Sequence, residues 1–208
     1  NAVLLANNNV NILSQATEHS SASQISSAHS NLLKSSSSHQ TSAMQGQQST
    51  GSLITGNSIG IQAGNDVSIQ GSKLIAQETL QLNAGRDLLI SSAQESSTQN
   101  QTYAAQSSGF NASLKGGLSY NNASTNQQQN GTSTSQIGSE LSAANILASS
   151  GRDTTIKAST LIADQDIHIN AGRNLNILAA ANTQSSQNAS LSSSSTLGLT
   201  GGLSTRQT

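Results

Sequence analysis

The chain has 208 residues, of which 33% are hydrophobic, 8% charged and 1% aromatic, and its formal net charge is −1. Eight Lys and Arg residues spread along such a chain provide no basic stripe for nucleic acid, and the lack of cysteine excludes disulfides, thiolate metal sites and a cysteine nucleophile. A near-neutral, proline-free chain rich in Ser, Asn and Gln instead suits flat β-stacking with ladders of small polar side chains.

The first predicted element is a partial repeat unit at residues 1–13. The segment 6–9 (Ala-Asn-Asn-Asn), followed by Val10 and Ile12, resembles fuller copies further along, with Asn7 where those copies have glycine. That departure is compatible with an end or a widened turn.

The opening residues carry neither the basic start nor the cleavage site of a signal peptide, and no apolar run approaches the ~18 residues of a membrane span. We interpret the sequence as an internal fragment of a longer protein.

Residues 14–50 form the first polar excursion between repeat units. Apolar residues such as Ile25, Leu32 and Leu33 are scattered in a serine-rich background, so the pattern is weak. Flexible linkers have this kind of composition, and β-hairpins or added strands are the alternative.

The strongest repeat lies in residues 51–94. The segment 53–73 can be set over 74–94, which is an offset of 21 in the numbering (74 − 53). Searching first for such periods is appropriate because stacked repeats each form one supersecondary unit. The expected partners are Leu53 with Leu74, Ile54 with Ile75, Ile59 with Leu80, Ile61 with Leu82, Asp66 with Asp87, Val67 with Leu88 and Ile69 with Ile90.

Each unit contains three short apolar pieces separated by tight corners. Two of the pieces alternate with period 2, as half-buried strands do. In the Ala-Gly-x-Asp corner we expect glycine to supply a positive φ and aspartate to bond the backbone ahead of it. Three strands in one unit of this length describe one coil of a parallel β-helix. One coil cannot cover its own apolar layer, so neighbours stacked about 4.8 Å away must do so.

Residues 91–137 form the second excursion. Apolar or small residues fall on every second position from Phe110 to Tyr120, which is typical of an amphipathic strand. We expect 121–131 to be a hairpin tip and 133–137 a returning strand. Disordered loops are the alternative.

Residues 138–181 repeat the coil pair, and 182–208 form a third excursion. Segment 140–160 sits over 161–181 at the same offset, and a longer offset of 87 (151 − 64) relates this pair to the earlier one. Alternation returns at 197–203, and Gly-Gly-Leu-Ser occurs at both 116–119 and 201–204. The expected partners are Leu141 with Ile162, Ile146 with Ile167, Gly151 with Gly172 and Ile156 with Ile177.

These motifs together resemble a known family. Ala-Gly-Arg-Asp (84–87), Ser-Gly-Arg-Asp (150–153), Ala-Gly-Arg-Asn (171–174) and Gly-Ser-x-Leu-Ile-Ala (71–76) look like the haemagglutinin-repeat region of two-partner-secretion exoproteins. That group includes filamentous haemagglutinins and CdiA-type contact-dependent growth inhibition toxins. The resemblance covers essentially the whole chain, which we interpret as one repeat region with coils at about 1–13, 51–94 and 138–181 and excursions at about 14–50, 91–137 and 182–208.

The resemblance implies an all-β, right-handed parallel β-helix with one coil for each repeat unit and with β-hairpin or loop excursions. It also implies secretion to the bacterial cell surface, with an outer-membrane two-partner-secretion transporter as export partner. The other implied partners are the remainder of the same exoprotein and the target-cell outer membrane or a receptor; none is nucleic acid. The implied function is to help carry a C-terminal toxin across the target cell's outer membrane. The alternative is the stalk of an adhesin that binds host cells or matrix.

Candidate chemical sites are sparse. His19, His29 and His39 lie ten residues apart without a carboxylate or cysteine at ligand spacing, so we interpret them as solvated. His168 lies between two isoleucines and should face outward.

The carboxylates invite comparison with sugar-processing β-helices, because a glycosidase needs two carboxyls about 5–10 Å apart. Asp164 and Asp166 lie close in one corner, and Asp66 should stack near Asp87, but corner aspartates bonded to backbone explain them more simply. The arginines that follow the turn glycines should stack outward or pair with a neighbouring Asp; they are Arg86, Arg152 and Arg173. We predict no catalytic, cofactor-binding or metal site and no enzyme activity.

Overall fold

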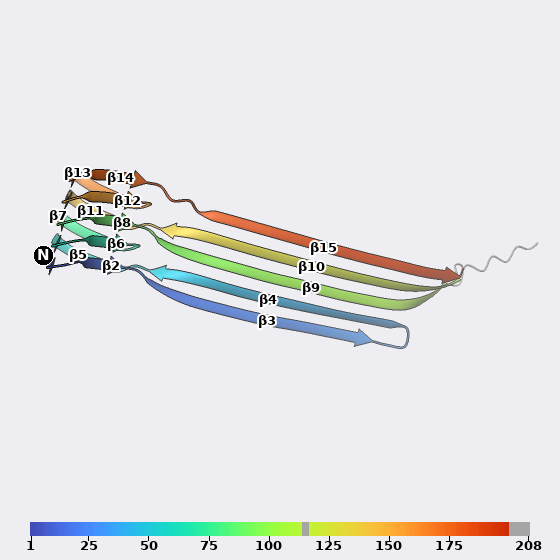
Figure 1. The fold of residues 1–208 in the computed structure, drawn as a ribbon. Helices are drawn as coiled ribbons and strands as arrows, with labels where there is room; N and C mark the ends of the chain where they lie inside the picture. The colour runs from blue at the N-terminus through green and yellow to red at the C-terminus, as the bar shows by residue number, and fades with distance from the viewer. Residues whose placement is uncertain (114–116, 200–208) are drawn as a thin grey trace, which may run out of the picture. The chain divides into compact units, whose positions relative to one another are not determined.

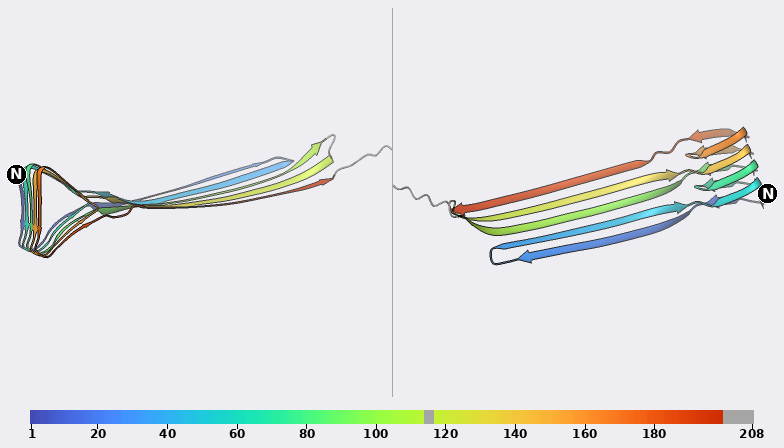
Figure 2. Two further views of the ribbon diagram at one scale, coloured as in Figure 1. Left: turned by 90° about the horizontal axis from the view of Figure 1, so that it is seen from above. Right: turned by 180° about the vertical axis from the view of Figure 1, so that it is seen from behind.

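The apolar residues that recur along the chain line the inside of a parallel β-helix. The computed structural model describes residues 1–113 and 117–199. Within them, two five-stranded parallel sheets form walls of the coils, which are seen end on as a triangle in Figure 2 (left). One wall has the order β1 (Ala2–Ala6), β5 (Leu53–Ala63), β7 (Lys73–Ala84), β11 (Glu140–Ser150) and β13 (Thr160–Ala171). The other has the order β2 (Val10–Leu13), β6 (Val67–Gln70), β8 (Leu88–Ser91), β12 (Asp153–Lys157) and β14 (Asn174–Leu178).

The predicted stacking is confirmed on two of the three sides of each coil. Ile59 pairs with Leu80 and Ile69 with Ile90, both at the predicted offset. The later coils repeat this register, with Ile146 on Ile167 and Ile156 on Ile177. Like side chains therefore form columns inside the coils.

On the first side, the predicted partners are wrong by one residue. Ile54 pairs with Leu74 and Leu53 with Lys73, because β7 has one more residue than β5 in the corner where the register shifts. Leu141 likewise pairs with Leu161 rather than Ile162. A one-residue slip exchanges the inner and outer faces of a strand. Leu74 is accordingly buried, whereas Leu53 is 64% exposed.

The excursions do not interrupt the stack. Leu80 pairs directly with Ile146 and Ile90 with Ile156, although the whole second excursion lies between these partners in the sequence. The longer sequence offset, which relates Gly64 to Gly151, therefore connects coils that are not neighbours in the stack. Buried aliphatic side chains form one continuous core through the coils; its fully buried members include Ile59, Ile61, Val67, Ile69, Leu74, Leu80, Leu82, Leu88, Ile90, Leu141 and Ile146.

The turn glycines are required for a reason other than the predicted one. Gly64, Gly85, Gly151 and Gly172 do not have positive φ; among the described residues only Gly71, Gly117 and Ala158 do. A Cβ at each of the four would instead lie 2.0 to 2.3 Å from a backbone carbonyl oxygen of the preceding coil. Glycine is therefore needed here because the backbones of adjacent coils approach closely.

The excursions form a third, antiparallel sheet, so the hairpin alternative is confirmed. Its order is β15 (Thr183–Leu199), β10 (Gly117–Ile137), β9 (Ala93–Ser113), β4 (Lys34–Thr50) and β3 (Gln15–Ser30). Adjacent arrows run in opposite directions in Figure 1, and facing side chains such as Ser27 and Ser38, or Thr41 and Thr102, are hydrogen-bonded.

The predicted tip of the second hairpin is wrong. Residues 121–131 lie inside strand β10, which begins at Gly117 and follows β9 along the chain. The alternation from Phe110 to Tyr120 thus comes from two strands that face each other. The motif residues 114–116 and 201–204 lie outside the described residues. The error arose because long Asn/Gln tracts resemble turns in composition but also pair readily in an exposed sheet.

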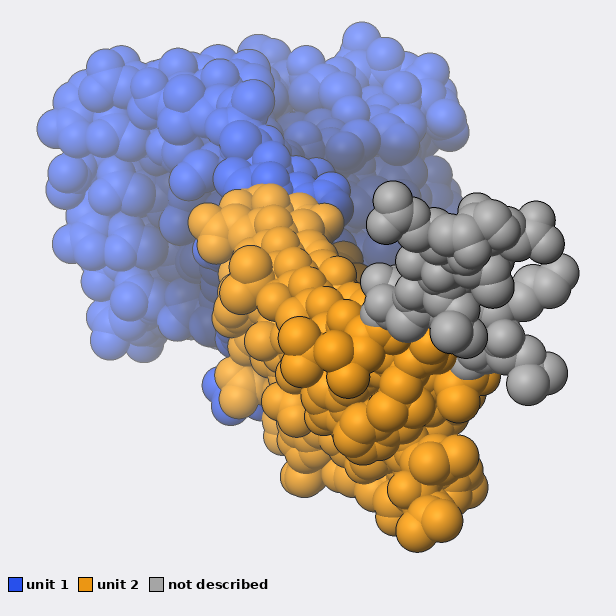
Figure 3. Space-filling view, turned by 90° about the vertical axis from the view of Figure 1, so that its right-hand side faces the viewer, with its two compact units in different colours: residues 1–19, 46–97, 133–184 blue, residues 20–45, 98–132, 185–208 orange. Residues whose placement is uncertain are grey.

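The chain divides into two compact units, which Figure 3 colours blue and orange. The coil unit comprises residues 1–19, 46–97 and 133–184, and includes the bases of the hairpin strands. The hairpin unit comprises residues 20–45, 98–132 and 185–208, of which 114–116 and 200–208 are outside the description. In the described part of the chain, no helix has the length and apolar character needed to cross a membrane.

Gly85 provides a test of the close coil contact. We expect Gly85→Ala to lower the free energy of unfolding by about 1–3 kcal/mol, as overpacking does, because its Cβ would lie 2.1 Å from the Gly64 oxygen. The matched control is Gly60→Ala in strand β5, where a new Cβ meets nothing within 4 Å. We expect that variant to be unchanged or more stable by up to about 1 kcal/mol. Urea denaturation of the two variants measures the difference, and equal effects would contradict the explanation.

Candidate functional surface

All hairpins leave the β-helix at one corner, the one that follows the second wall. The chain leaves after β2, β8 and β14, and the first two hairpins return at Gly51 and Gly138. At the two corners without a hairpin, one residue makes the turn with positive φ: Gly71 (φ 55°) and Ala158 (φ 46°). Direct turns and hairpins therefore alternate from coil to coil.

A column of serines ties this corner together. Ser72 and Ser139 are almost completely buried. The Ser72 hydroxyl donates to the Gln70 carbonyl (2.9 Å) and accepts from the Ser52 backbone N–H (3.2 Å). The Ser139 hydroxyl donates to the Ser91 carbonyl (2.7 Å) and accepts from the Ser72 N–H (3.3 Å). Each hydroxyl thus accepts from the N–H of a serine in a neighbouring coil, and it donates to a carbonyl that also accepts a backbone bond from another coil.

The alternation matches the spacing of the two kinds of sheet. Each hairpin adds two strands to the antiparallel sheet, and each pair of coils adds two strands to every wall of the β-helix. Neighbouring strands are about 4.8 Å apart in both kinds of sheet. One hairpin for every second coil therefore lets the strand bases in the coil unit pair continuously. The contacts agree: the Ser49 N–H donates to Glu95 (3.0 Å), the Ser92 hydroxyl donates to Gln136 (2.7 Å), and Thr134 bonds Thr183 (2.6 Å).

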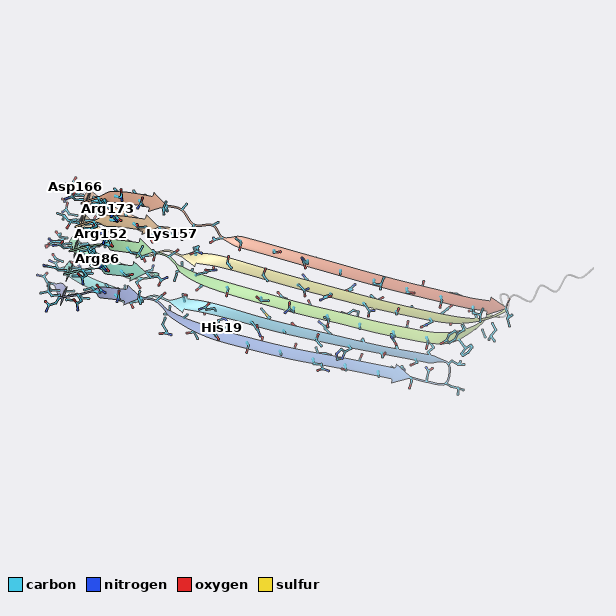
Figure 4. All side chains as sticks on the ribbon, viewed as in Figure 1. His19, Arg86, Arg152, Lys157, Asp166 and Arg173 are labelled. Atoms are coloured by element: carbon cyan, nitrogen blue, oxygen red, sulfur yellow. The ribbon has the colours of Figure 1, made fainter. Side chains whose placement is uncertain are left out.

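The opposite corner carries a charged ladder, and the predicted Arg–Asp pairing is confirmed. Arg86 forms two bonds to Asp66, Arg173 forms two to Asp153, and Arg152 lies 3.6 Å from Asp87. These arginines come from successive coils (Figure 4).

The aspartates bond backbone in the next coil rather than in their own turn. Asp66 Oδ1 accepts from the Asp87 N–H (3.1 Å), and Asp87 Oδ1 from the Asp153 N–H (3.2 Å). The Arg173 guanidinium lowers the pKa of Asp153 from 3.8 to about 2, and Arg86 lowers the pKa of Asp66. Carboxylates held ionised in this way stabilise the stack and are poorly suited to proton transfer.

The other predicted positions are dispersed. His168 is exposed on β13, as expected, and Asp164 and Asp166 are exposed beside it. His39 bonds Ser26 (3.0 Å). Residues 1–113 and 117–199 contain no cluster of three or more His, Asp or Glu side chains placed to hold a metal ion.

The described part of the hairpin unit has almost no charge. All nine Asp and Glu residues belong to the coil unit, and Lys34 is the one Lys or Arg in the described part of the hairpin unit. None of its described residues is buried. The unit is therefore a sheet with two accessible faces and without the apolar core that normally stabilises one.

Large apolar side chains gather on one face of this sheet, at the end where β9 passes into β10. Phe110 on β9 faces Tyr120 on β10, with ring centroids 4.8 Å apart. Gly198 on β15 faces Ser119, which brings Leu197 and Leu199 beside Tyr120 and Leu118. We call the five residues Phe110, Leu118, Tyr120, Leu197 and Leu199 the tip cluster; between 37% and 77% of each is exposed. Alternation in the sequence indicated these residues, but only the pairing of three strands brings them together.

The fold and this surface define a class of protein: a parallel β-helix that extends hairpins from alternate coils. Residues 33–195 match the family described as Hemagglutinin repeat. The chain belongs to the haemagglutinin-repeat family.

Several curated relatives are similar to much of the chain. The tRNA nuclease CdiA-2 of Burkholderia pseudomallei (strain 1026b) is 32% identical over 158 residues, which is 74% of this chain and 5% of the relative. The 16S rRNA endonuclease CdiA of Enterobacter cloacae subsp. cloacae is 31% identical over 66% of this chain and 4% of its own length. A hemolysin of Serratia marcescens is 27% identical over 73% of this chain and 10% of its own length.

The chain thus spans a small part of the relatives that it matches, and it is a haemagglutinin-repeat region related to CdiA and hemolysin exoproteins. No solved structure matches it.

The charged ladder predicts an acid sensitivity. Because the pKa of Asp153 is lower in the folded chain (about 2) than its usual value of 3.8, its stabilising effect is complete above about pH 4 and is lost as the pH falls towards 2. We expect Asp153→Asn to reduce the fall in melting temperature over that range. Asp164→Asn, at an exposed carboxylate with no ion pair in the described part of the chain, is the control. Identical pH profiles for wild type and Asp153→Asn would contradict the role.

Proposed function

We propose that this chain is a structural and delivery segment of a large, secreted, cell-surface CdiA-type exoprotein, and that it helps carry a C-terminal toxin across the target cell's outer membrane. We further propose that residues 1–208 are one repeat region without catalytic activity. Its partners would be the two-partner-secretion transporter during export, the remainder of the exoprotein, and the target outer membrane or a receptor.

The tip cluster is the observation that carries the proposal. A cluster of exposed apolar side chains at one end of a mostly polar sheet is typical of a surface that meets a membrane or a protein. The described hairpin unit has no carboxylate to desolvate, and carboxylates are costly to place in a bilayer. Its inner strands also have their backbone groups paired by neighbours, which a lipid environment requires.

The coil unit would serve as the scaffold. Its continuous core and its serine and Asp–Arg columns join every coil to the next. Asp66 and Asp87, which the repeat brings close together as a glycosidase would need, are engaged by arginines and by backbone N–H groups. These contacts support a mechanical role and disfavour an enzymatic one.

An adhesin stalk is the second candidate. The exposed polar faces of the hairpin unit favour it, since amide and hydroxyl side chains in a rigid sheet suit recognition of host or matrix surfaces. The two candidates differ in whether the tip cluster or a polar face is needed for contact with another cell.

Excision of the second hairpin tests the delivery function. Joining Ser91 directly to Gly138 copies the corner Gln70-Gly71-Ser72, which links two coils without a hairpin. We expect a parent exoprotein that lacks residues 92–137 to reach the cell surface but to lose killing of target cells. Surface display is measured with an antibody to another segment. Full killing by the displayed variant would refute the proposal.

A substitution test separates the tip from the hairpin as a whole. We expect Phe110→Ser with Tyr120→Ser and Leu197→Ser to reduce binding to outer-membrane vesicles of target cells at least tenfold, because about 2 kcal/mol or more of burial is lost for each side chain. The control is Asn121→Ser with Ser107→Asn, at polar positions on the opposite face, which should bind as wild type. Unchanged vesicle binding by the triple variant would show that the tip cluster makes no membrane contact.

A further inference from the structure

A second feature of the hairpin unit lies on the face opposite the tip cluster. There, a shallow hollow of about 550 Å³ surrounds Tyr103 and is lined mainly by glutamines from three strands and by Asn188. Tyr103 and Phe110 are on opposite faces because they lie seven residues apart in β9. The hollow therefore belongs to a surface separate from the apolar one.

The strand pairing places the lining residues in two rows. Thr41 faces Thr102, so Gln40 faces Tyr103 in the next position. Phe110 faces Tyr120, and β9 and β10 run in opposite directions. The residue seven positions before Phe110, Tyr103, therefore faces the residue seven positions after Tyr120, which is Gln127. The ring thus has a glutamine on either side in its own row. The neighbouring row contains Gln101, Gln129 and Asn188.

These amides are not used to hold the sheet together. Among the described residues, no side-chain hydrogen bond engages Gln40, Gln101, Gln127 or Gln129. This differs from the serine and threonine pairs elsewhere in the unit, which bond across strands. Each amide provides two donors and one acceptor group to whatever occupies the hollow.

The chemistry of the lining selects one class of ligand. No charged side chain lines the hollow, so it offers nothing to attract an ionic ligand. An aromatic ring surrounded by amides provides an apolar surface on which C–H groups of a ligand can pack. The amides around it provide hydrogen-bond donors and acceptors for hydroxyl groups. We propose that this hollow is a binding site for a neutral oligosaccharide, with Tyr103 stacking on one sugar ring and the flanking glutamines bonding its hydroxyls. The site does not depend on toxin delivery.

The competing occupant is a second copy of the chain. A flat face of glutamines could stack against the same face of another molecule through interdigitated side chains. Stacking would depend on protein concentration and would not require sugar, so the two occupants can be distinguished.

The test uses the whole chain and three neutral probes: chitotetraose, cellotetraose and lacto-N-tetraose. The chain has two tyrosines and no tryptophan, so the Tyr120→Phe background makes Tyr103 the single tyrosine fluorophore. We expect a saturable fluorescence change with at least one probe. Tyr103→Ala, followed by calorimetry, should weaken binding at least tenfold, and Gln127→Ala should weaken it several-fold.

The matched control is Gln106→Ala, which removes a glutamine from the opposite face of the same strand and should bind as wild type. Strand content by circular dichroism verifies that each variant folds. Failure of all three probes to bind, or full binding by folded Tyr103→Ala, would overturn the site. Self-association in ultracentrifugation that Tyr103→Ala abolishes, without sugar binding, would assign the hollow to a second copy.

Discussion

The stacking of one coil directly on another is the constraint on which the rest of the structure depends. Backbone ladders fix the rise between coils at about 4.8 Å, and at the turn the chains approach so closely that a Cβ has no room. Every other column follows from this spacing. Aliphatic side chains and serines meet their counterparts in the next coil, and each turn arginine meets an aspartate of a neighbouring coil, because the ladder places equivalent residues one above the other.

The same spacing explains how long polar insertions are tolerated. An insertion of a hairpin at one corner adds two strands without separating the coils on either side, as the direct pairing of Ile90 with Ile156 demonstrates. Turns by Gly71 and Ala158 replace the hairpin at alternate corners. The chain can therefore carry a polar, almost uncharged sheet while the coils retain an unbroken apolar core.

The division of charge between the units connects the fold with the proposed function. Carboxylates and most cations are confined to the coil unit, where the Arg–Asp pairs join neighbouring coils. The hairpins present amides and hydroxyls, the tip cluster at one end of one face, and Tyr103 on the other face. A scaffold and a contact surface are thus encoded in alternating segments of one chain. The delivery and adhesin proposals both rely on this division and differ in which face makes the contact.

Repeat period, strand type and family were determined by the sequence alone, because residues that stack in a β-helix must be similar and recur at a constant interval, as Ile59 and Leu80 do. The Arg–Asp pairing was also predictable, since each arginine follows a turn glycine in the same place. Other features were decided only by tertiary structure. The register of the first side depends on one additional residue in a corner of β7, which no alignment of apolar positions reveals.

The glycine requirement likewise arises from a neighbouring coil rather than from the local turn. The tip cluster and the Tyr103 hollow are each assembled from strands distant in sequence. Their residues become neighbours only when the hairpins pair. The alternation of apolar and polar residues within one strand does not predict which strand lies beside it.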